Sequence, residues 1–337
     1  MPKPYNDGSP CAYADASPSM IDILSITGPI YIIIGLGFTA TRLGRFTRPD
    51  MGVLGKFVVN FALPALLFNS LAQRPIGEIL NGSYLLVYLT GTLFVVGIGY
   101  FWSRRFAGLD STTSTFYAMG MSCSNSGFVG YPILLLTMAP ISGVALALNM
   151  IVENLFITPL LLAMADRSCG KPDRWYRAIG HAFGRLAANP LIIAIFAGFC
   201  VSIAQWRLPE AAVRTVSMLA LASGALALFV IGGTLVGLPT QGLGKRVAPI
   251  VMGKLILHPL AVLTAIQILP IVGLPMMIPS LETAAVIMAA MPMMSIYTIL
   301  AQIYGREEIS AAAMLVTTIV SFFTISGLLV ILKPLPV

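Results

Sequence analysis

Long apolar stretches alternate with short polar connections along almost the whole chain. A stretch of about twenty apolar residues can cross the hydrocarbon core of a bilayer as a helix. The sequence predicts ten such helices and therefore an all-α integral membrane protein, with spans at residues 20–41, 52–72, 83–103, 112–138, 141–165, 187–206, 212–236, 247–270, 281–303 and 309–332. Too few residues remain between these spans for a soluble domain of any size.

Two of the ten stretches are interrupted by residues that do not suit a continuous helix. The first interruption is Ser122-Cys-Ser-Asn-Ser-Gly-Phe-Val-Gly-Tyr-Pro132, and the second is Ala289-Ala-Met-Pro-Met-Met-Ser-Ile-Tyr297. Backbone groups freed by such a break are tolerated at membrane depth only where they are buried in protein or line a cavity. We therefore expect helices four and nine to be broken. Two interrupted helices in corresponding positions are typical of the binding site of a secondary transporter.

The two halves of the chain are similar to each other. Pro132 and Pro292 are separated by the same number of residues as the matching segments that begin at Pro64 and Gly224. Each half contains five stretches, an odd number, so the second half must enter the bilayer upside down relative to the first. The sequence predicts two inverted five-helix repeats with a tail before them and a linker between them, namely a tail at 1–18, repeats at 19–165 and 187–333, and the linker at 166–186.

The distribution of charge predicts the orientation of the chain. Only 10% of the residues are charged, but 20 Lys and Arg against 13 Asp and Glu give a net charge of +7. If the N-terminus is outside, fifteen of the twenty basic residues fall in cytoplasmic connections, which agrees with the positive-inside rule. We expect a multi-pass protein of the cell (inner) membrane with both termini outside and a cytoplasmic linker. The lipid bilayer explains this charge without a nucleic-acid partner.

The sequence contains no recognisable metal, cofactor or enzyme motif. The four cysteines, at positions 11, 123, 169 and 200, do not have the spacing of a zinc site. Gly-x-Ser-x-Gly, His-Glu-x-x-His and paired catalytic aspartates are absent from the sequence. We expect no metal, no cofactor and no enzymatic activity.

The residues of the two interruptions form the candidate substrate site. The second half of a broken helix presents unpaired N–H groups and a partial positive charge, which stabilise an anion. Two such ends that face each other can hold a carboxylate without a buried arginine. The alternative is a structural kink whose polar groups satisfy only one another. The expected substrate contacts are Ser124, Asn125, Ser126, Gly127, Gly130, Pro132, Pro292, Ser295 and Tyr297.

Glu153 is the only acidic residue near the centre of any predicted span. An ionised acid at this depth costs about 2.5–3.5 kcal/mol even on lenient insertion scales, so an intramembrane carboxylate suggests a function. Glu153 can carry a proton or help to hold a cation such as sodium, together with Asn149 and Asn154. The alternative is a structural Glu that is protonated or hydrogen-bonded.

Helices two and eight supply further candidates. Pro64 frees the carbonyl of Asn60, and the two residues form either a hinge or cavity wall or a kink kept for packing. His258 can titrate near neutral pH, although a lone helical histidine is more often a packing residue. Lys254, one turn earlier, is expected to extend its ammonium group to the membrane interface.

Six segments of the sequence resemble the auxin efflux carrier family, the bacterial relatives of the plant PIN-type carriers. The resemblance covers nearly all of residues 20–332 and implies two inverted five-helix repeats, a scaffold part, and a transport part in which broken helices four and nine cross. It also implies a homodimer, transport of organic anions, and a substrate contact by Asn125. Bacterial members are associated with carboxylates such as malonate, malate or lactate. The segments are Asn60-Phe-Ala-Leu-Pro-Ala-Leu-Leu-Phe68, Asn125-Ser-Gly-Phe-Val-Gly-Tyr-Pro-Ile133, Asn189-Pro-Leu-Ile-Ile193, Lys254-Leu-Ile-Leu-His-Pro-Leu260, Ala290-Met-Pro292 and Leu300-Ala-Gln-Ile-Tyr-Gly305.

The chain departs from this family at Ser223-Gly224 in helix seven, where a proline is common. A symmetric hinge motion of the two halves therefore does not follow from the resemblance.

These observations together predict a secondary carrier of a small mono- or dicarboxylate that works by alternating access at the helix crossover. The carrier is coupled to a proton or sodium gradient, or it runs downhill. Two alternatives stay open. One is a sodium-coupled symporter of larger, bile-acid-type anions, and the other is a membrane receptor that binds its ligand without moving it.

Overall fold

A computed structural model describes residues 20–75, 80–168, 188–238 and 244–332. Within these ranges the regular elements are α-helices and four short π-helical turns, labelled η. The elements are α1 (Met20–Arg42), α2 (Arg48–Phe57), η1 (Val58–Ala62), α3 (Leu63–Ala72), α5 (Gly82–Arg105), α6 (Ser111–Ser122), η2 (Ser126–Gly130), α7 (Tyr131–Thr137), α8 (Ala139–Val152), η3 (Glu153–Ile157), α9 (Thr158–Ser168), α11 (Pro190–Ala204), α12 (Glu210–Thr234), α13 (Gly244–Met252), η4 (Gly253–Leu257), α14 (His258–Ile268), α15 (Pro279–Ala289), α16 (Tyr297–Ile303) and α17 (Glu307–Leu332).

The helices confirm an all-helical membrane protein. Six helical stretches in the described part of the chain are long and apolar enough to cross a membrane, and three more apolar helices are shorter. The ten-helix inverted repeat stays a prediction, and so do the proposed domain boundaries. The predicted tail at 1–18 and most of the predicted linker at 166–186 lie outside the described residues.

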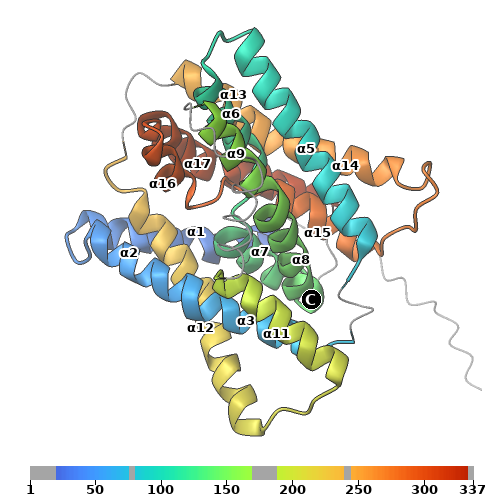
Figure 1. The fold of residues 1–337 in the computed structure, drawn as a ribbon. Coiled ribbons are helices and arrows are strands. Elements are labelled where there is room, and N and C mark those ends of the chain that lie inside the picture. Colours follow the sequence, from blue (N-terminus) through green and yellow to red (C-terminus); the bar gives the residue numbers. More distant parts are fainter. Residues whose placement is uncertain (1–19, 76–79, 169–187, 239–243, 333–337) are drawn as a thin grey trace, which may run out of the picture.

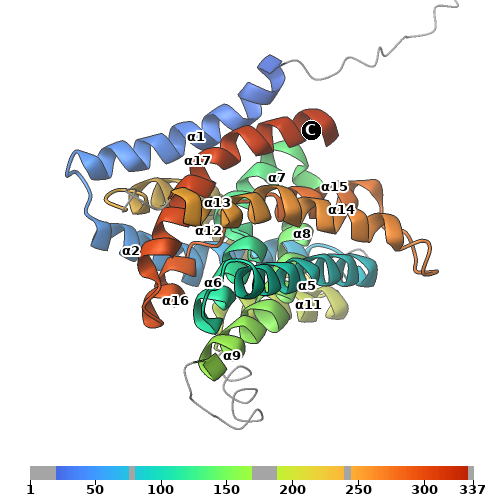
Figure 2. The same cartoon turned by 90° about the horizontal axis from the view of Figure 1, so that it is seen from above.

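Most of the helices belong to two bundles. The first bundle consists of α1, α2 with α3, α11 and α12, and it occupies the lower part of Figure 1. The second bundle consists of α5, α6, α8 with α9, α13 with α14, α15, α16 and α17. The short helix α7 contacts α8 and also α1 and α12, so it lies where the bundles meet. Figure 2 shows α1 and α17 side by side at the same boundary.

Close backbone contact between α1 and α12 holds the first bundle together. A Cβ atom on Gly37 would collide with the carbonyl group of Phe229, and one on Gly232 would collide with the carbonyl group of Ile34. Small residues at such positions let two helices approach closely in a membrane, where association depends on van der Waals contact. The two glycines therefore fix the distance between α1 and α12.

Both predicted interruptions are present as breaks between helices. Helix four ends at Ser122 and resumes at Ser126, while helix nine ends at Ala289 and resumes at Tyr297. Pro292 cannot donate a backbone hydrogen bond, and it disfavours the helical conformation of the residue before it. The side chain of Asn125 caps the restarted helix, since its Oδ1 accepts from the N–H of Phe128 at 3.3 Å.

Each of the four π-helical turns precedes a proline at the same spacing. The prolines are Pro64, Pro132, Pro159 and Pro259, and the residue before each of them donates its N–H to the carbonyl five residues earlier. Proline has no N–H and its ring crowds the carbonyl four residues earlier, which would interrupt a regular helix. A wider turn absorbs this defect locally, so three of these helices continue across the membrane and the restarted part of helix four stays intact.

Candidate functional site

The unwound segments of helices four and nine pair with each other. Ser124 and Met293 form an isolated antiparallel bridge. The N–H of Asn125 donates to the carbonyl of Pro292 at 2.7 Å, and the N–H of Met294 donates to the carbonyl of Cys123 at 3.3 Å. Because the two breaks supply each other's hydrogen bonds, backbone groups that would be costly in hydrocarbon are satisfied inside the protein.

A buried carboxylate lies against the start of the second half of helix four. Glu153 Oε1 accepts from the N–H of Ser124 at 3.0 Å, and both carboxyl oxygens are 3.2 Å from Ser126 Oγ. The same Ser126 Oγ accepts from Asn149 Nδ2 at 3.1 Å, and Asn149 Oδ1 in turn accepts from the hydroxyl of Tyr84 at 2.8 Å. The structure thus brings together four predicted residues, Glu153, Asn149, Ser124 and Ser126.

A buried ammonium group lies on the other side of Ser124. Lys254 Nζ donates to Ser124 Oγ at 2.6 Å and to the carbonyl of Ala289 at 2.9 Å, and it lies 2.7 Å from His258 Nδ1. The expectation that Lys254 reaches the membrane interface is wrong, because its side chain is fully buried at 0% exposure. The polar partners of the ammonium group lie at the crossover, where Ser124 bonds both Lys254 and Glu153. These contacts hold the ammonium group inside the protein.

Asn125 and Ser295 connect the two breaks through their side chains. Asn125 Nδ2 donates to Ser295 Oγ at 2.8 Å, and Asn125 is only 4% exposed. Tyr297 is buried too, and its hydroxyl donates to the carbonyl of Phe116 at 2.9 Å, so it ties the second half of helix nine to the first half of helix four.

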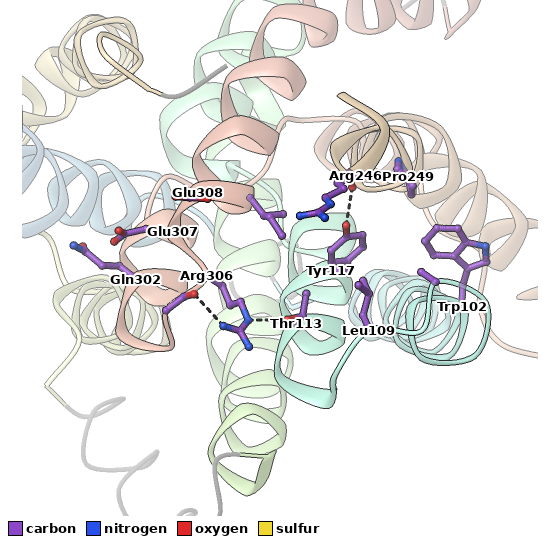
Figure 3. A pocket seen from close by; sticks show the side chains of 13 residues that line it. Trp102, Leu109, Thr113, Tyr117, Arg246, Pro249, Gln302, Arg306, Glu307 and Glu308 are labelled. Atoms are coloured by element: carbon purple, nitrogen blue, oxygen red, sulfur yellow. Dashed lines mark hydrogen bonds between the residues drawn. The ribbon is translucent and has the colours of Figure 1, made fainter. Parts of the chain in front are cut away.

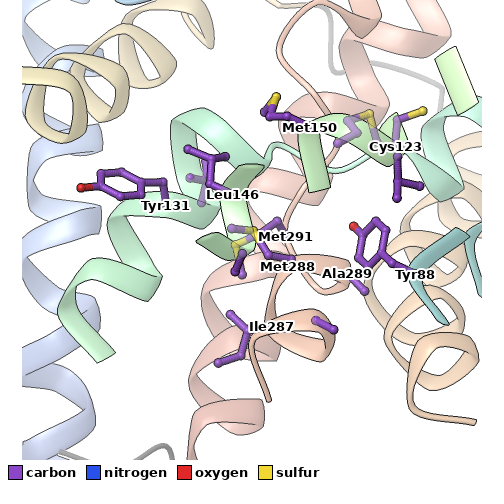
Figure 4. Packing of buried hydrophobic residues seen from close by; sticks show 14 of the residues in the cluster. Tyr88, Cys123, Tyr131, Leu146, Met150, Ile287, Met288, Ala289 and Met291 are labelled. Carbon is purple, nitrogen blue, oxygen red and sulfur yellow. The ribbon is translucent and has the colours of Figure 1, made fainter. Parts of the chain in front are cut away.

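The predicted glycines at the crossover serve close packing. A Cβ atom on Gly130 would lie 2.6 Å from Met288 Sδ and 3.2 Å from Met291 Cγ, and one on Gly127 would lie 3.0 Å from Leu63 Cδ1. Figure 4 shows Met288 and Met291 between Tyr131 of α7 and Tyr88 of α5. The breaks are therefore surrounded by an apolar shell that isolates the polar groups.

Three predicted residues lie apart from this cluster. The side chain of Asn154 donates to the carbonyl of Met150, and the side chain of Asn60 donates to the carbonyl of Lys56. Pro64 ends the π turn of helix two in the first bundle. None of these interactions involves Glu153, Ser124 or Lys254.

A cavity of ≈ 460 Å³ lies between the first bundle and α7. Its volume falls within the range of about 300–1,000 Å³ that is usual for small-molecule sites. Tyr131 and Pro132 line one side, and the polar groups in the lining include those of Asn69, Ser70 and Ser223. Gly224, which stands where a proline is expected, lies next to Pro132 in this lining, since a Cβ atom on it would be in van der Waals contact with Pro132 Cγ at 3.8 Å.

A larger cavity of ≈ 820 Å³ opens at the end of the second bundle where α5 ends and α6, α13 and α17 begin. Figure 3 shows Arg306 turned towards Thr113, and Tyr117 next to Arg246. Arg306 also pairs with Asp110 at 3.3 Å. Burial alone would raise the pKa of the Asp110 carboxyl, but hydrogen bonds from Thr113 and the charge of Arg306 outweigh burial and hold that pKa below its ordinary value.

Sequence reasoning missed four residues of the buried cluster, namely Lys254, Tyr84, Tyr88 and Thr92. The tyrosines look like ordinary apolar positions of α5, and only the fold shows that their hydroxyls reach Asn149 and Ser124. Thr92 lies 3.0 Å from His258 Nε2. Lys254 did carry a usable signal, because a charged residue within a span is a reason to look for a buried partner.

A helical membrane protein in which two discontinuous helices meet through their unwound segments has the architecture of a secondary transporter. The chain belongs to the auxin efflux carrier-like family of membrane transport proteins, whose model, described as "Membrane transport protein", matches residues 23–174 and 171–329.

Curated relatives have related names. A Rhizobium meliloti protein named "Putative malonate transporter" is 29% identical over 323 residues, which cover 93% of this chain and 97% of the relative. The Escherichia coli protein named "Uncharacterized transporter YfdV" is 26% identical over 245 residues, or 70% of this chain and 75% of the relative. A Methanothermobacter thermautotrophicus protein named "Uncharacterized transporter" is 34% identical over 106 residues, or 31% of this chain and 34% of the relative.

Proposed function

We propose that the chain is a secondary carrier of a small organic anion, a mono- or dicarboxylate such as malonate, malate or lactate. The observation that carries this proposal is the pairing of two broken helices through Ser124 and Met293, next to buried polar side chains. Irregular backbone at this depth is expected where it lines a substrate path. The Rhizobium meliloti relative, whose name includes malonate, supports a carboxylate.

The contacts around Asn125 favour its amide as the substrate contact. A carboxylate oxygen is a stronger acceptor than a hydroxyl, because charge-assisted hydrogen bonds are roughly twice as strong as neutral ones. A substrate carboxylate would therefore replace Ser295 Oγ as the acceptor for Asn125 Nδ2. The start of the second half of helix four at Ser126 already holds the carboxyl group of Glu153, so we place the substrate carboxylate on the Asn125 and Ser295 side of the crossover.

The cavity between the first bundle and α7 suggests how the substrate approaches. It is bounded by α1, α3 and α12 of the first bundle and by α7, so movement of one bundle against the other would change its access. We propose alternating access by this movement, with helices four and nine crossing in two inverted repeats. We also propose that the chain lies in the inner membrane with both termini outside, since the basic residues of the sequence favour that orientation. The resemblance to the auxin efflux carrier family leads us to propose a homodimer.

The test uses the purified full chain in proteoliposomes. Counterflow is measured with labelled malonate, malate and lactate and with a bile acid, at several pH values and in sodium or choline chloride. We expect counterflow of at least one small carboxylate, and liposomes without protein are the control. Counterflow of the bile acid alone, only in sodium, would identify the bile-acid-type symporter. Saturable binding without counterflow of any anion would identify a receptor and reject the carrier.

A further inference from the structure

The ammonium group of Lys254 has a partner for each of its three N–H bonds. Two are oxygens, Ser124 Oγ and the carbonyl oxygen of Ala289, and the third is His258 Nδ1, all within 2.9 Å. An ammonium group has three donors and no acceptor, so this set satisfies it completely. Lys254 is also fully buried at 0% exposure. The sequence therefore builds a closed cation site and fills it with its own side chain.

The tautomer of His258 follows from its two neighbours. Thr92 Oγ1 donates to the carbonyl of Tyr88 at 2.6 Å, so it accepts from His258 Nε2 at 3.0 Å. Because Nε2 then carries the proton, Nδ1 is free to accept from Lys254 Nζ. The network thus assigns a neutral histidine and a charged lysine.

The position of the ammonium group along helix nine gives it a second stabilisation. Ala289 is the last residue of α15, and carbonyl groups at the C-terminal end of a helix lack intrahelical partners and carry partial negative charge. In transporters with discontinuous helices, carbonyls of such half-helix ends coordinate a coupling cation. In this chain the ammonium group of Lys254 takes that place.

Glu153 balances the charge of Lys254 without direct contact. Ser124 lies between them, since its N–H donates to Glu153 Oε1 and its Oγ accepts from Lys254. In the part of the chain that the structure describes, Glu153 and Lys254 are the buried carboxyl and ammonium groups. The neighbouring titratable groups are Tyr84 and Tyr88 on α5, Cys123 at the break and His258 on α14.

We propose that Lys254 is a tethered cation that takes the place of a bound sodium ion at the break of helix nine, so that the crossover needs no metal cation to hold its geometry. Lys254 is a positioning residue in this role, because it acts on the substrate through Ser124 and the end of α15. The inference rests on the proposed carrier function only where transport is measured. It resolves the open choice between sodium and other coupling in favour of a sodium-independent carrier.

The test compares sodium chloride with choline chloride at equal concentration in wild type and in Lys254→Met, Lys254→Arg and Lys254→Met/Glu153→Gln. Thermal unfolding of the purified full chain is followed, and malonate uptake into proteoliposomes is measured as a second readout. Wild type and Lys254→Arg are expected to unfold at the same temperature in both salts. Lys254→Met leaves Glu153 unpaired, so its unfolding temperature is expected to rise in sodium and its malonate uptake in choline to fall by about tenfold or more. The double variant has no unpaired charge and is expected to be insensitive to sodium.

Three results would overturn the tethered cation. They are stabilisation of wild type by sodium, a Lys254→Met variant as insensitive to sodium as wild type, and a double variant that keeps the sodium response of the single one. If Lys254→Met does not fold, the proposal is tested on wild type and Lys254→Arg. Stabilisation of either protein by sodium would then reject the proposal. Thermal unfolding needs no substrate. If wild type carries no anion, the proposed function fails while these sodium comparisons still test Lys254.

Discussion

The backbone N–H of Asn125 donates to the carbonyl of Pro292 at 2.7 Å, which joins the breaks of helices four and nine directly. The side chain of the same asparagine continues the connection to Ser295. One residue thus takes part in both the backbone and the side-chain pairing of the crossover. Substitution of Asn125 therefore tests the proposed function most directly.

Asn125→Ala should abolish transport while the protein stays folded. The backbone bond to Pro292 does not need the side chain, whereas the amide proposed to bind the carboxylate is lost. We expect carboxylate counterflow to fall by up to about a hundredfold, since the hydrogen bond from Asn125 Nδ2 to a charged group is worth about 1.5–3 kcal/mol. Asn154→Ala is the matched control, because Asn154 bonds only within its own helix. Wild-type flux in Asn125→Ala would eliminate the site.

Glu153→Gln should flatten the pH dependence of uptake. Glutamine keeps the shape of the side chain and removes the only buried carboxyl group among the described residues. Uptake of labelled malonate is measured between pH 5 and pH 8 in proteoliposomes with clamped internal pH. A pH profile that matches wild type would remove Glu153 from the coupling mechanism.

Glu153→Gln should also destabilise the folded protein, because it leaves the charge of Lys254 buried without a counter-charge. Breaking one partner of a buried pair typically costs about 3–5 kcal/mol. The double variant with Lys254→Met should recover most of this stability. Additive losses in a double-mutant cycle of unfolding temperatures would show that the two groups do not interact through Ser124.

Gly224→Leu should impair transport by filling the cavity between the first bundle and α7. Gly224 and Pro132 lie next to each other there, so an isobutyl group would occupy space next to α7. We expect uptake to fall by about tenfold with little change in stability, because the side chain enters existing space instead of a packed core. Unchanged uptake in Gly224→Leu would place the substrate path elsewhere.

Gly37→Ala and Gly232→Ala should each destabilise the first bundle. Each added methyl group would collide with a backbone carbonyl of the facing helix, and such overpacking typically costs about 1–3 kcal/mol. Gly35→Ala is a close control on the same helix, because a Cβ atom there meets no other group within 4 Å. The three unfolding temperatures in detergent are compared. Equal values would show that the α1–α12 contact can relax freely.

Asp110→Asn should weaken the start of α6 in a pH-dependent way. The carboxyl group caps α6 and pairs with Arg306, and its pKa is lower in the folded protein than in the unfolded chain. Its contribution to stability is therefore complete above the unfolded pKa of about 3.9 and is lost as the pH falls through the folded pKa. The effect should be small, about 1 kcal/mol or less, because the group is partly exposed. Unfolding temperatures are compared with those of Glu210→Gln, which removes a more exposed pair with Arg214.

The amino-acid pattern was sufficient for the all-helical class and for the two breaks. Pro292 and the cluster from Ser122 to Pro132 act on the local backbone, so their effect is visible in the sequence itself. The burial of Glu153 also followed from its position in an apolar stretch. In each case the residues that cause the feature, a helix break or a buried carboxyl group, lie in one continuous segment of the sequence.

The partners across the site were not predictable in the same way. Lys254 reaches Ser124 and Ala289 only because α14 packs against α5 and α15, and helical periodicity contains no information on such pairings. A lysine stem can extend to the interface or turn inward, and the choice depends on which polar groups the fold brings near. The π turns escaped prediction too, since proline indicates a defect but not how a helix accommodates it.

The four π turns have a consequence for how relatives of this chain can differ in length. A π turn holds one residue more than the α-helical path it replaces, and one residue corresponds to a rotation of about 100° around the helix axis. The turn absorbs that rotation locally, so a deletion there, combined with loss of the proline six residues after the start of the turn, would restore a regular helix and leave its two ends in the same relative orientation. Single-residue gaps in an alignment of the family should therefore collect before Pro64, Pro132, Pro159 and Pro259.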